Sequence, residues 1–394
     1  MTEKLYYKDA YLKEFDAKVI DTKTCENKEE YICLDKTAFY PEGGGQPCDM
    51  GVLTTSNGLT VRVNDVQETD GIIWHRVDKE IKAGETVHGI IDWERRFDHM
   101  QQHSGEHIVS GMLCERFGCD NVGFHMGETF ITIDYNAVIT FEDALEIEAK
   151  ANRYIWEDHP FKEKWPSQEE LKTITYRSKK ELTGNVRITS FEGADTCACC
   201  GTHVSSSAQV GIVKIISAKK FHDGTRIELY CGKRAFDYLS ANYEQNKAAA
   251  VLLSTSEENT AAVVKKMSDE NISLKKTLSH FENAYYDLRA ESLMGESEVF
   301  LFEDGLDSIQ GRQLADRISD TCAGLVIVFV KDGDKYRYSA ICKNKDISGF
   351  IKEMNNALDG RGGGRNGFAQ GALSASRVEI EKYLSALELH HPHK

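Results

Sequence analysis

Soft metal-type side chains gather in one short stretch of the chain. The sequence D-T-C-A-C-C-G-T-H-V places Cys197, Cys199 and Cys200 just before His203. Such a group suits a redox pair, a nucleophilic cysteine or half of a metal site. The spacing of Cys197 and Cys200 fits a C-x-x-C redox motif, but no thioredoxin-like β-α-β pattern precedes it. Nothing in the sequence singles out a base for a cysteine nucleophile.

A second group of such side chains lies earlier, in H-S-G-E-H. His103 and His107 are four residues apart, which puts both imidazoles on one face of a helix. Cys199 and His203 repeat this spacing. Three imidazoles and one thiolate form a borderline-soft tetrahedral set of the kind that zinc accepts. The two pairs together therefore predict one zinc ion held by His103, His107, Cys199 and His203.

The same H-S-G-E-H segment allows a rival hypothesis. It also reads as H-x-x-E-H, the inverted zincin signature, with Glu106 as the general base of a metallopeptidase. That hypothesis expects a carboxylate as third ligand and gives Cys199 and His203 no role. Gly105 inside a helix costs about 1 kcal/mol relative to Ala, so we expect a neighbouring segment to approach the helix closely there.

The composition is that of a globular protein. Of 394 residues, 41% are hydrophobic and 28% are charged, which suits about two to four domains. We find no apolar run of about 18 residues and no signal peptide at the start, so we expect no membrane span and a cytoplasmic location. Eleven cysteines without an export signal indicate reduced thiols or metal ligands rather than disulfides. A net charge of −15 argues against a general polyanion binder, but not against a nucleic-acid enzyme with a local basic path.

The periodicity of the chain changes along its length. Residues 1–91 form short alternating runs separated by turn residues, which predicts a β-rich domain. From Asp92 to Gly118 apolar residues recur at helical spacing, and a mixed segment of helix and strands follows up to residue 232. Residues 296–394 look like a separate α/β unit that contains a Gly-rich segment.

Residues 233–294 contain neither Gly nor Pro and predict long helices. Apolar residues recur in heptads there, with one polar exception, in the two columns Val264, Asn271, Leu278, Tyr285 and Met267, Leu274, Phe281, Leu288. This pattern is typical of a coiled coil whose buried Asn fixes the register. A helical hairpin broken at residues 254–259, a dimer stalk and a helix lying on its own core all remain open.

At this point four motifs together resemble a known family. The H-x-x-x-H and C-x-x-x-H pairs resemble those of the editing domain of alanyl-tRNA synthetase and of free-standing alanyl-tRNA editing proteins of the long AlaX type. T-A-F-Y-P-E-G-G-G-Q at 37–46 and G-F-H-M-G at 123–127 are similar to two further stretches of that domain. G-R-G-G-G-R-N-G-F-A-Q-G resembles the Gly-rich motif of the synthetase's C-terminal domain. One departure is Cys200, which stands where the family usually has a glycine and could compete for the metal.

The resemblance implies an α+β fold with four parts. These are a β-barrel-like domain over 1–91, a zinc-containing editing domain over 92–232, a helical hairpin or coiled-coil linker over 233–295 and a small α/β domain over 296–394. The last domain would bind RNA or mediate assembly, so a homodimer is an expectation. The chain leaves no room for a class II aminoacylation domain, so the resemblance implies a trans-editing hydrolase rather than a ligase.

The implied substrate is tRNA(Ala) mischarged with serine, or with glycine. Zinc would polarise the ester carbonyl, lower the pKa of a bound water or orient the substrate. Thr37 would read the serine hydroxyl and Gln46 would bind substrate or place water, while Gly43, Gly44 and Gly45 would let backbone approach the ligand. Arg361 and Arg365 would contact tRNA phosphates from a Gly-rich loop. A metallopeptidase and a noncatalytic RNA-binding module with structural zinc are the alternatives.

Overall fold

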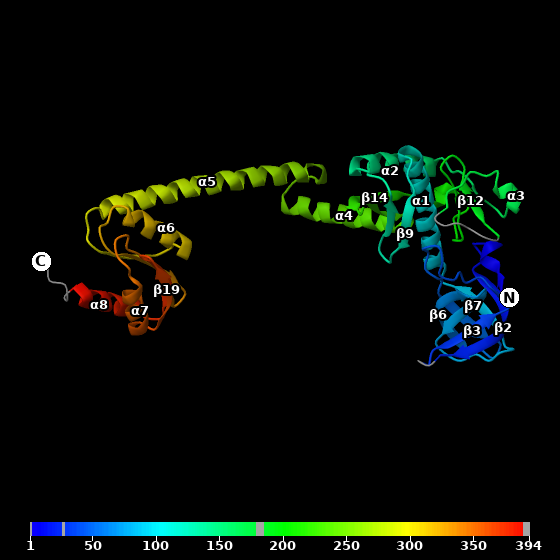
Figure 1. Cartoon of the computed structure of the whole chain (residues 1–394), viewed down its shortest axis with the longest axis horizontal. Helices are drawn as coiled ribbons and strands as arrows, with labels where there is room; N and C mark the ends of the chain where they lie inside the picture. Colours follow the sequence, from blue (N-terminus) through cyan, green and yellow to red (C-terminus); the bar gives the residue numbers. More distant parts are fainter. Residues whose placement is uncertain (1, 26–27, 179–184, 389–394) are drawn as a thin grey trace. The chain divides into compact units, whose positions relative to one another are not determined.

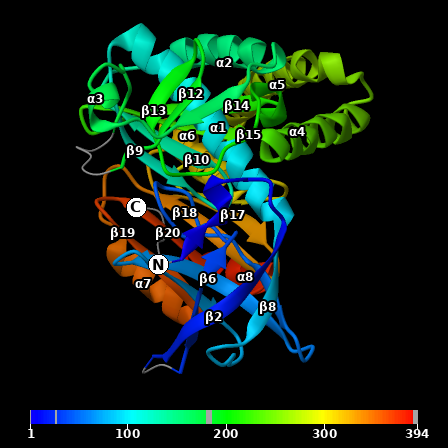
Figure 2. The same cartoon turned by 90° about the vertical axis from the view of Figure 1, so that its right-hand side faces the viewer.

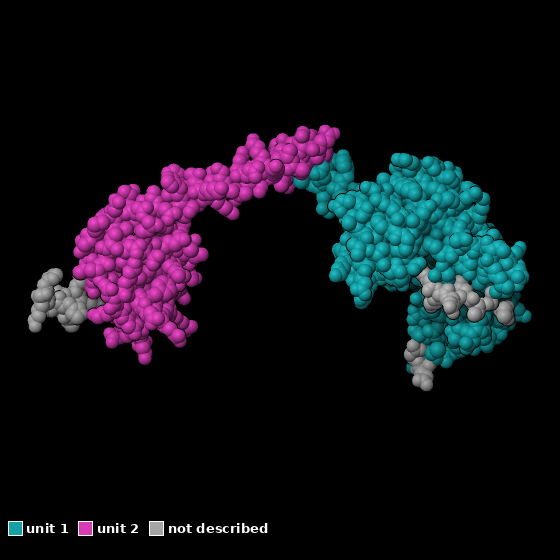
Figure 3. All heavy atoms as spheres, turned by 45° about the horizontal axis from the view of Figure 1, so that its top comes forward, with its two compact units in different colours: residues 1–249 teal, residues 250–394 magenta. Residues whose placement is uncertain are grey.

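The computed structural model describes residues 2–25, 28–178 and 185–388. The chain forms two compact units, residues 1–249 and 250–394, which Figure 3 shows in separate colours. Both units contain helices and strands (Figure 1), so the mixed α+β class that the sequence predicts is confirmed. The division into four domains stays a prediction.

Six strands near the N-terminus close into a barrel, visible in Figure 2. In barrel order they are β2 (Glu14–Thr24), β3 (Glu30–Leu34), β7 (Ile72–Val77), β6 (Thr60–Thr69), β5 (Gly51–Thr55) and β8 (Thr86–Ile91). Every neighbouring pair is antiparallel. Most of β2 alternates exposed and buried residues, as expected for a strand with one face on the barrel core. A short strand β1 (Glu3–Lys4), followed by one turn of 3-10 helix (Leu5–Tyr7), pairs in parallel with β4 (Lys36–Thr37) beside the barrel. The predicted barrel is confirmed.

The helix that carries the two histidines begins and ends where the sequence predicts. α1 spans Trp93–Phe117, and the side chain of Asp92 caps it by accepting a hydrogen bond from the backbone N–H of Arg95. Gly118 ends it in the left-handed conformation with φ of 59°. α2 (Phe141–Trp156) begins in the same way, because Thr140 accepts from the N–H of Asp143.

A four-stranded antiparallel sheet lies against α1 and α2. Its order is β14 (Val213–Phe221), β15 (Gly224–Cys231), β10 (Ile131–Tyr135) and β9 (Asn121–Met126). Apolar residues of both helices and of the sheet form one core, separate from the core of the barrel. A second, three-stranded sheet consists of β11 (Phe161–Lys164), β12 (Ile188–Phe191) and β13 (Asp195–Ala198). A single helical turn, α3 (Gln168–Leu171), follows β11, and a 3-10 turn (Ser207–Val210) precedes β14.

Two glycines of α1 let neighbouring segments touch the helix backbone. A Cβ at Gly105 would lie 2.3 Å from the Sγ of Cys231 in β15, so the close approach expected there is confirmed. A Cβ at Gly111 would lie 2.1 Å from the carbonyl oxygen of Ala194, just before β13. Both contacts fix strands of the site against the helix that bears the histidines.

A buried ion pair joins α1 to the barrel. Arg96 and Asp49 are both 0% exposed. The Arg96 guanidinium donates to the Asp49 carboxylate from both Nε and Nη2. The same guanidinium donates to the carbonyl oxygens of Ala10 at 2.8 Å and Ala38 at 2.6 Å. Asp49 also accepts from the N–H of Tyr40 at 2.6 Å. The start of α1 is therefore tied at once to the chain before β2 and to the chain between β4 and β5, both of which flank the barrel strands.

The Gly- and Pro-free segment forms two helices rather than one. α4 spans Gly232–Leu252 and α5 spans Thr260–Ser292, with a short 3-10 turn at Glu257–Asn259 between them. Of the alternatives left open by the sequence, the one with a break at residues 254–259 agrees with this interruption. Most of the heptad columns of α5 are solvent-exposed, with Leu274 at 68% and Phe281 at 64%. Within the described part of the chain these residues do not pack on a core.

The C-terminal unit is a five-stranded sheet between helices. Its order is β16 (Val299–Glu303), β17 (Val326–Asp332), β18 (Lys335–Ile341), β20 (Phe368–Leu373) and β19 (Gly360–Arg365). Alternate residues of β17 face opposite sides. Val328 packs with Leu314 of α6 (Ser308–Ser319), while Phe329 lies in the core formed with α7 (Ser348–Ala357) and α8 (Arg377–Glu388).

The Gly-rich segment is not the loop that we expected. Residues 360–365 form β19, an edge strand that pairs with β20 in register from Gly360 opposite Leu373 to Arg365 opposite Phe368. Glycine permits this because a Cβ at Gly362 would lie 2.3 Å from the carbonyl oxygen of Gln370.

Among the described residues, no helix is long and apolar enough to cross a membrane.

Candidate metal centre

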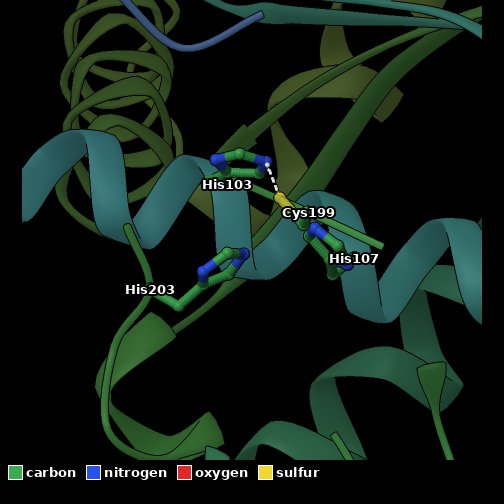
Figure 4. A group of neighbouring side chains, drawn as sticks. All are labelled: His103, His107, Cys199 and His203. Atoms are coloured by element: carbon green, nitrogen blue, oxygen red, sulfur yellow. Dashed lines mark hydrogen bonds between the residues drawn. The ribbon is translucent and has the colours of Figure 1, made fainter. Parts of the chain in front are cut away.

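The structure brings together the four residues predicted as metal ligands. His103 and His107 lie on one face of α1, and Cys199 and His203 come from the segment after β13 (Figure 4). One donor atom of each residue lies within 4.8 Å of all the others, and His103 Nε2 is 3.4 Å from Cys199 Sγ. The backbone N–H of Val204 donates to Ser104 Oγ at 3.1 Å and so fixes the Cys/His segment to the helix between the two histidines.

Hydrogen bonds orient two of the imidazoles. His103 Nδ1 lies 2.9 Å from Gln46 Oε1, and His107 Nδ1 lies 2.7 Å from Asp195 Oδ2. Gln46 Oε1 also accepts from the backbone N–H of Thr202 at 3.1 Å, which identifies this atom as the oxygen. Both acceptors therefore place the imidazole proton on Nδ1 and leave Nε2 free for a metal, as outer partners of metal-bound histidines do.

Neither nitrogen of the third imidazole has a hydrogen-bond partner in the part of the chain that the structure describes. That imidazole belongs to His203, which is only 2% exposed. Its ring stacks on Phe161 of β11, with centroids 4.8 Å apart and planes at 14°. A buried polar group without a partner is costly, and a metal would remove this cost. The donor set therefore fits a metal ion.

The charges of the cluster also suit a cation. Burial favours the neutral thiol of Cys199, but the three histidines outweigh it and hold its pKa well below the usual range. Burial likewise favours neutral His107, but the Cys199 thiolate and the Asp195 hydrogen bond raise its pKa to about 10. Without a metal, the cluster thus keeps a thiolate beside a protonated imidazole. A divalent cation would replace that proton, because metal ligands bind in their deprotonated forms.

A pocket of about 470 Å³ opens beside the cluster. Its lining includes His103, His107 and Cys199, together with Gly44 and Gly45 of the predicted Gly-rich segment. Both glycines are needed for close contact. A Cβ at Gly44 would lie 2.9 Å from Cys200 Sγ, and one at Gly45 would lie 2.6 Å from the ring of Phe124. Phe124 in turn stacks on His103 with centroids 5.3 Å apart.

Three charged residues lie at the site that the four-ligand prediction did not include. Asp195 holds His107 and accepts two hydrogen bonds from Arg177, at 2.7 and 2.9 Å. Arg177 lines the pocket, as does Glu106, whose Oε1 accepts from Ser110 and from Asn121. No spacing rule singles out Asp195 or Arg177, because their pairing depends on the fold.

The metallopeptidase hypothesis loses its support here. It expects a carboxylate as third ligand and leaves Cys199 and His203 without a function, but both residues lie with the two histidines. The nearest Glu106 oxygen is 4.0 Å from His107 Nε2. Asp195 contacts His107 through Nδ1, the nitrogen that faces away from the cluster.

The other predicted residues lie in different places. Gln46 is fully buried and its amide is engaged with His103 and Thr202, so it supports the cluster from behind. Thr37 is also fully buried, is not among the described residues that line the pocket, and has its hydroxyl 2.8 Å from His75 Nε2. Gly43 makes a tight turn with Gln46. Arg361 and Arg365 are exposed on β19 of the other unit. The functional roles assigned to them stay predictions.

The thiols of Cys199 and Cys200 should differ in reactivity. Burial and the neighbouring Cys199 charge raise the pKa of Cys200, whereas the pKa of Cys199 is lowered. Cys199 therefore has the larger thiolate fraction in metal-free protein, and thiolates alkylate faster than thiols. We expect iodoacetamide to modify Cys199 before Cys200, with a difference that shrinks as the pH is raised and Cys200 ionises as well. Peptide mass mapping would measure this, and faster labelling of the more exposed Cys200 would contradict it.

Three family models match parts of the chain. "tRNA synthetases class II (A)" matches residues 1–95, "Threonyl and Alanyl tRNA synthetase second additional domain" matches residues 186–228, and "DHHA1 domain" matches residues 296–388. The second match contains Cys199 and His203 and the strands that hold them.

Curated relatives match nearly the whole chain. Alanyl-tRNA editing protein AlaX-L of Pyrococcus horikoshii is 29% identical over 96% of this chain and 96% of its own length. The alanine–tRNA ligases of Pyrococcus furiosus and Ignicoccus hospitalis are 32% and 31% identical over 98% of this chain. The chain spans only 43% of the length of these two ligases.

One solved structure matches a part of the chain. The C-Ala domain of Aquifex aeolicus alanyl-tRNA synthetase matches 24% of this chain and 91% of that domain, at 22% identity and a TM-score of 0.21, which is too low to compare the folds. The similarity rests on the curated relatives and on the three domain matches. The chain resembles, over nearly its whole length, the free-standing alanyl-tRNA editing proteins of the long AlaX type and the editing and C-terminal domains of alanyl-tRNA synthetase.

Proposed function

We propose that the chain is a trans-editing hydrolase that cleaves the ester bond of tRNA(Ala) mischarged with serine or glycine. The observation that carries this proposal is the cluster of His103, His107, Cys199 and His203 in the wall of a pocket. The similarity to AlaX-L over 96% of both chains supports the choice of substrate. A pocket of about 470 Å³ lies within the range that accommodates small ligands, so it suits an aminoacyl group on a terminal ribose.

We further propose that the metal is zinc. Three imidazoles and one thiolate are ligands that zinc prefers, and the tetrahedral number of donors is complete. A bound zinc would supply either polarisation of the ester carbonyl and of water or a fixed point for orienting the substrate. Four protein ligands favour the orienting role, because closed sites are usually structural.

The residues around the cluster would position the ligands and the substrate. Gln46 and Asp195 hold the proton on Nδ1 of His103 and His107, so that both Nε2 atoms point to one centre. Arg177 keeps the Asp195 carboxylate ionised and in place. Phe124 and the backbone of Gly44 and Gly45 close the pocket around the ester.

Deacylation of charged tRNA tests the proposal. Purified full-length protein should contain about one zinc per chain by elemental analysis and should release serine from Ser-tRNA(Ala) faster than alanine from Ala-tRNA(Ala). Replacing His203 by Ala should lower both the zinc content and the hydrolysis, since neither ring nitrogen of His203 has a hydrogen-bond partner among the described residues. Protein that binds zinc but releases no amino acid would instead indicate an RNA-binding module with a structural metal.

Thr37 is the residue that we propose reads the serine hydroxyl. Its match to the leading threonine of the family's Gly-rich segment supports this role. Thr37 is buried beside His75, so the side chain of the bound serine would have to reach the Thr37 hydroxyl from the pocket. Alternatively, Thr37 would act through the backbone of residues 37–39, because its Oγ1 accepts a hydrogen bond from the N–H of Phe39. Burial lowers the pKa of His75 to about 4, so the imidazole is neutral and accepts from Thr37 through Nε2.

The substitution Thr37→Val tests this role while keeping the side-chain volume. Loss of one buried hydrogen bond costs on the order of 1 kcal/mol, so we expect the preference for Ser-tRNA(Ala) over Ala-tRNA(Ala) to fall several-fold. Thr37→Ser keeps the hydroxyl and should retain the preference. An unchanged preference in Thr37→Val, with a lower melting temperature, would make Thr37 and His75 a purely structural pair.

Arg361 and Arg365 are proposed to bind tRNA through the edge of the C-terminal sheet. β19 is the edge strand, its three central residues are glycines, and all residues from 361 to 365 are exposed. A strand without side chains presents its free N–H groups directly, and the two guanidinium groups add charge. This gives a net-negative protein a local contact for phosphates.

Replacing both arginines by Ala should weaken tRNA binding and flatten its salt dependence by about two phosphate contacts. Binding titrations at several salt concentrations measure this slope. Arg337→Ala is a matched control, because Arg337 lies in the same sheet but is paired with Asp332. An unchanged slope in the double variant would favour an assembly role for this unit, with the exposed heptad residues of α5 as the surface to test by sedimentation of a homodimer.

A further inference from the structure

A large aromatic side chain is exposed close to the metal-ligand segment. Trp165 directly follows β11, and its side chain is 50% exposed. Its ring rests edge-on against Tyr7, with centroids 5.4 Å apart and planes at 74°. The guanidinium of Arg187 also lies over the ring of Tyr7, with its central carbon 5.1 Å from the ring centroid. The indole is thus held from behind while half of it faces solvent.

Two routes of contact tie this aromatic group to the site. Arg187 donates to the carbonyl oxygens of Gly201 at 2.7 Å and Cys199 at 3.3 Å, so the residue behind Tyr7 also holds the loop of the ligands. On the other side, Tyr6 contacts both Tyr7 and Tyr40 edge-on, at 4.6 and 5.4 Å. The hydroxyl of Tyr40 lies 3.8 Å from the Sγ of Cys200, which lines the pocket.

Strand β11 sets the spacing between Phe161, which contacts the cluster, and the indole of Trp165. Phe161 stacks on His203 at one end of the strand, and Trp165 follows four residues later. At about 3.3 Å per residue this separation is about 13 Å. Residues 161, 163 and 165 share one face of an extended segment, and Glu163 on that face binds Arg187 at 2.8 Å. Stacked nucleotides rise about 3.4 Å each, so 13 Å corresponds to at most about four of them.

We propose that Trp165, supported by Tyr7, is a stacking platform for a base in the single-stranded 3′ end of the tRNA substrate. This rests on the proposed function, since an ester on the terminal ribose must enter the pocket with the last unpaired nucleotides leading out of it. Unpaired bases stack on exposed aromatic rings without regard to sequence, which suits a 3′ end that is common to all tRNAs. The exposed face of Trp165 supplies that ring about four nucleotide rises from Phe161, the residue that stacks on His203.

Binding of an uncharged RNA hairpin to the full-length protein tests the platform without any hydrolysis. One hairpin ends in an unpaired 3′-ACCA and the other is blunt. Trp165→Ala should weaken binding of the first hairpin by about 5- to 150-fold, the range of one base stacked on an aromatic ring, and leave the second unchanged. Trp165→Phe keeps a ring and should restore most of the loss.

Trp156→Ala is the matched control, because Trp156 is a second tryptophan of the same unit, 68% exposed at the end of α2. It should bind both hairpins as the unmodified protein does. Equal binding of the two hairpins by the unmodified protein, or an equal loss for both hairpins in Trp165→Ala, would overturn the platform. Deacylation of Ser-tRNA(Ala) by the unmodified protein is measured separately, so failure of the proposed function is distinguished from failure of the platform.

Discussion

The buried pair of Arg96 and Asp49 is the constraint on which the arrangement of the N-terminal unit depends. A charge at 0% exposure is stable only when it is paired and fully hydrogen-bonded, and Arg96 meets this condition with Asp49 and with two barrel carbonyls. All of these partners lie in segments that flank the barrel strands, whereas Arg96 lies in the first turn of α1, two turns before His103. Removing one partner would leave a buried charge, at a cost of about 3–5 kcal/mol. The barrel and the histidine helix are therefore held in one orientation.

This orientation explains how the barrel reaches the metal centre. Gln46 follows the Gly-rich segment of the barrel domain, yet its amide binds His103 and Thr202. The same segment meets β9, since the N–H of Met126 donates to the carbonyl oxygen of Gly45. Gly44 and Gly45 then pass too close to Cys200 and Phe124 for any side chain. The cluster is thus supported from three directions: by α1, by the segment after β13 and by the barrel.

The sequence analysis was most successful where the chemistry is local. Four-residue spacing singled out two pairs of side chains that the structure brings together, although Cys199 and His203 lie in a loop and not on a helix. Asp92 and Gly118 predicted both ends of α1, because capping signals act within a single turn. It was wrong about the Gly-rich segment at 360–365, because glycine suits an edge strand under close contact as well as a loop. It missed Asp195, Arg177 and the Arg96–Asp49 pair, whose partners are 18 to 88 residues apart. Such pairs depend on the packing of separate elements, and a single sequence read by itself contains no signal for them.

The two histidines of α1 illustrate why a motif alone does not define a metal site. The imidazoles lie on one helix with ring centroids 5.2 Å apart, and two like groups at this distance would repel each other if both were protonated. The fold avoids this by assigning each ring a different environment. A neutral amide oxygen faces Nδ1 of His103, whereas an ionised carboxylate held by Arg177 faces Nδ1 of His107. One ring is therefore held by a dipole and the other by a charge, and the Cys199 thiolate lies beside both Nε2 atoms. A divalent cation held by these donors would displace the proton of His107, because metal ligands bind in their deprotonated forms.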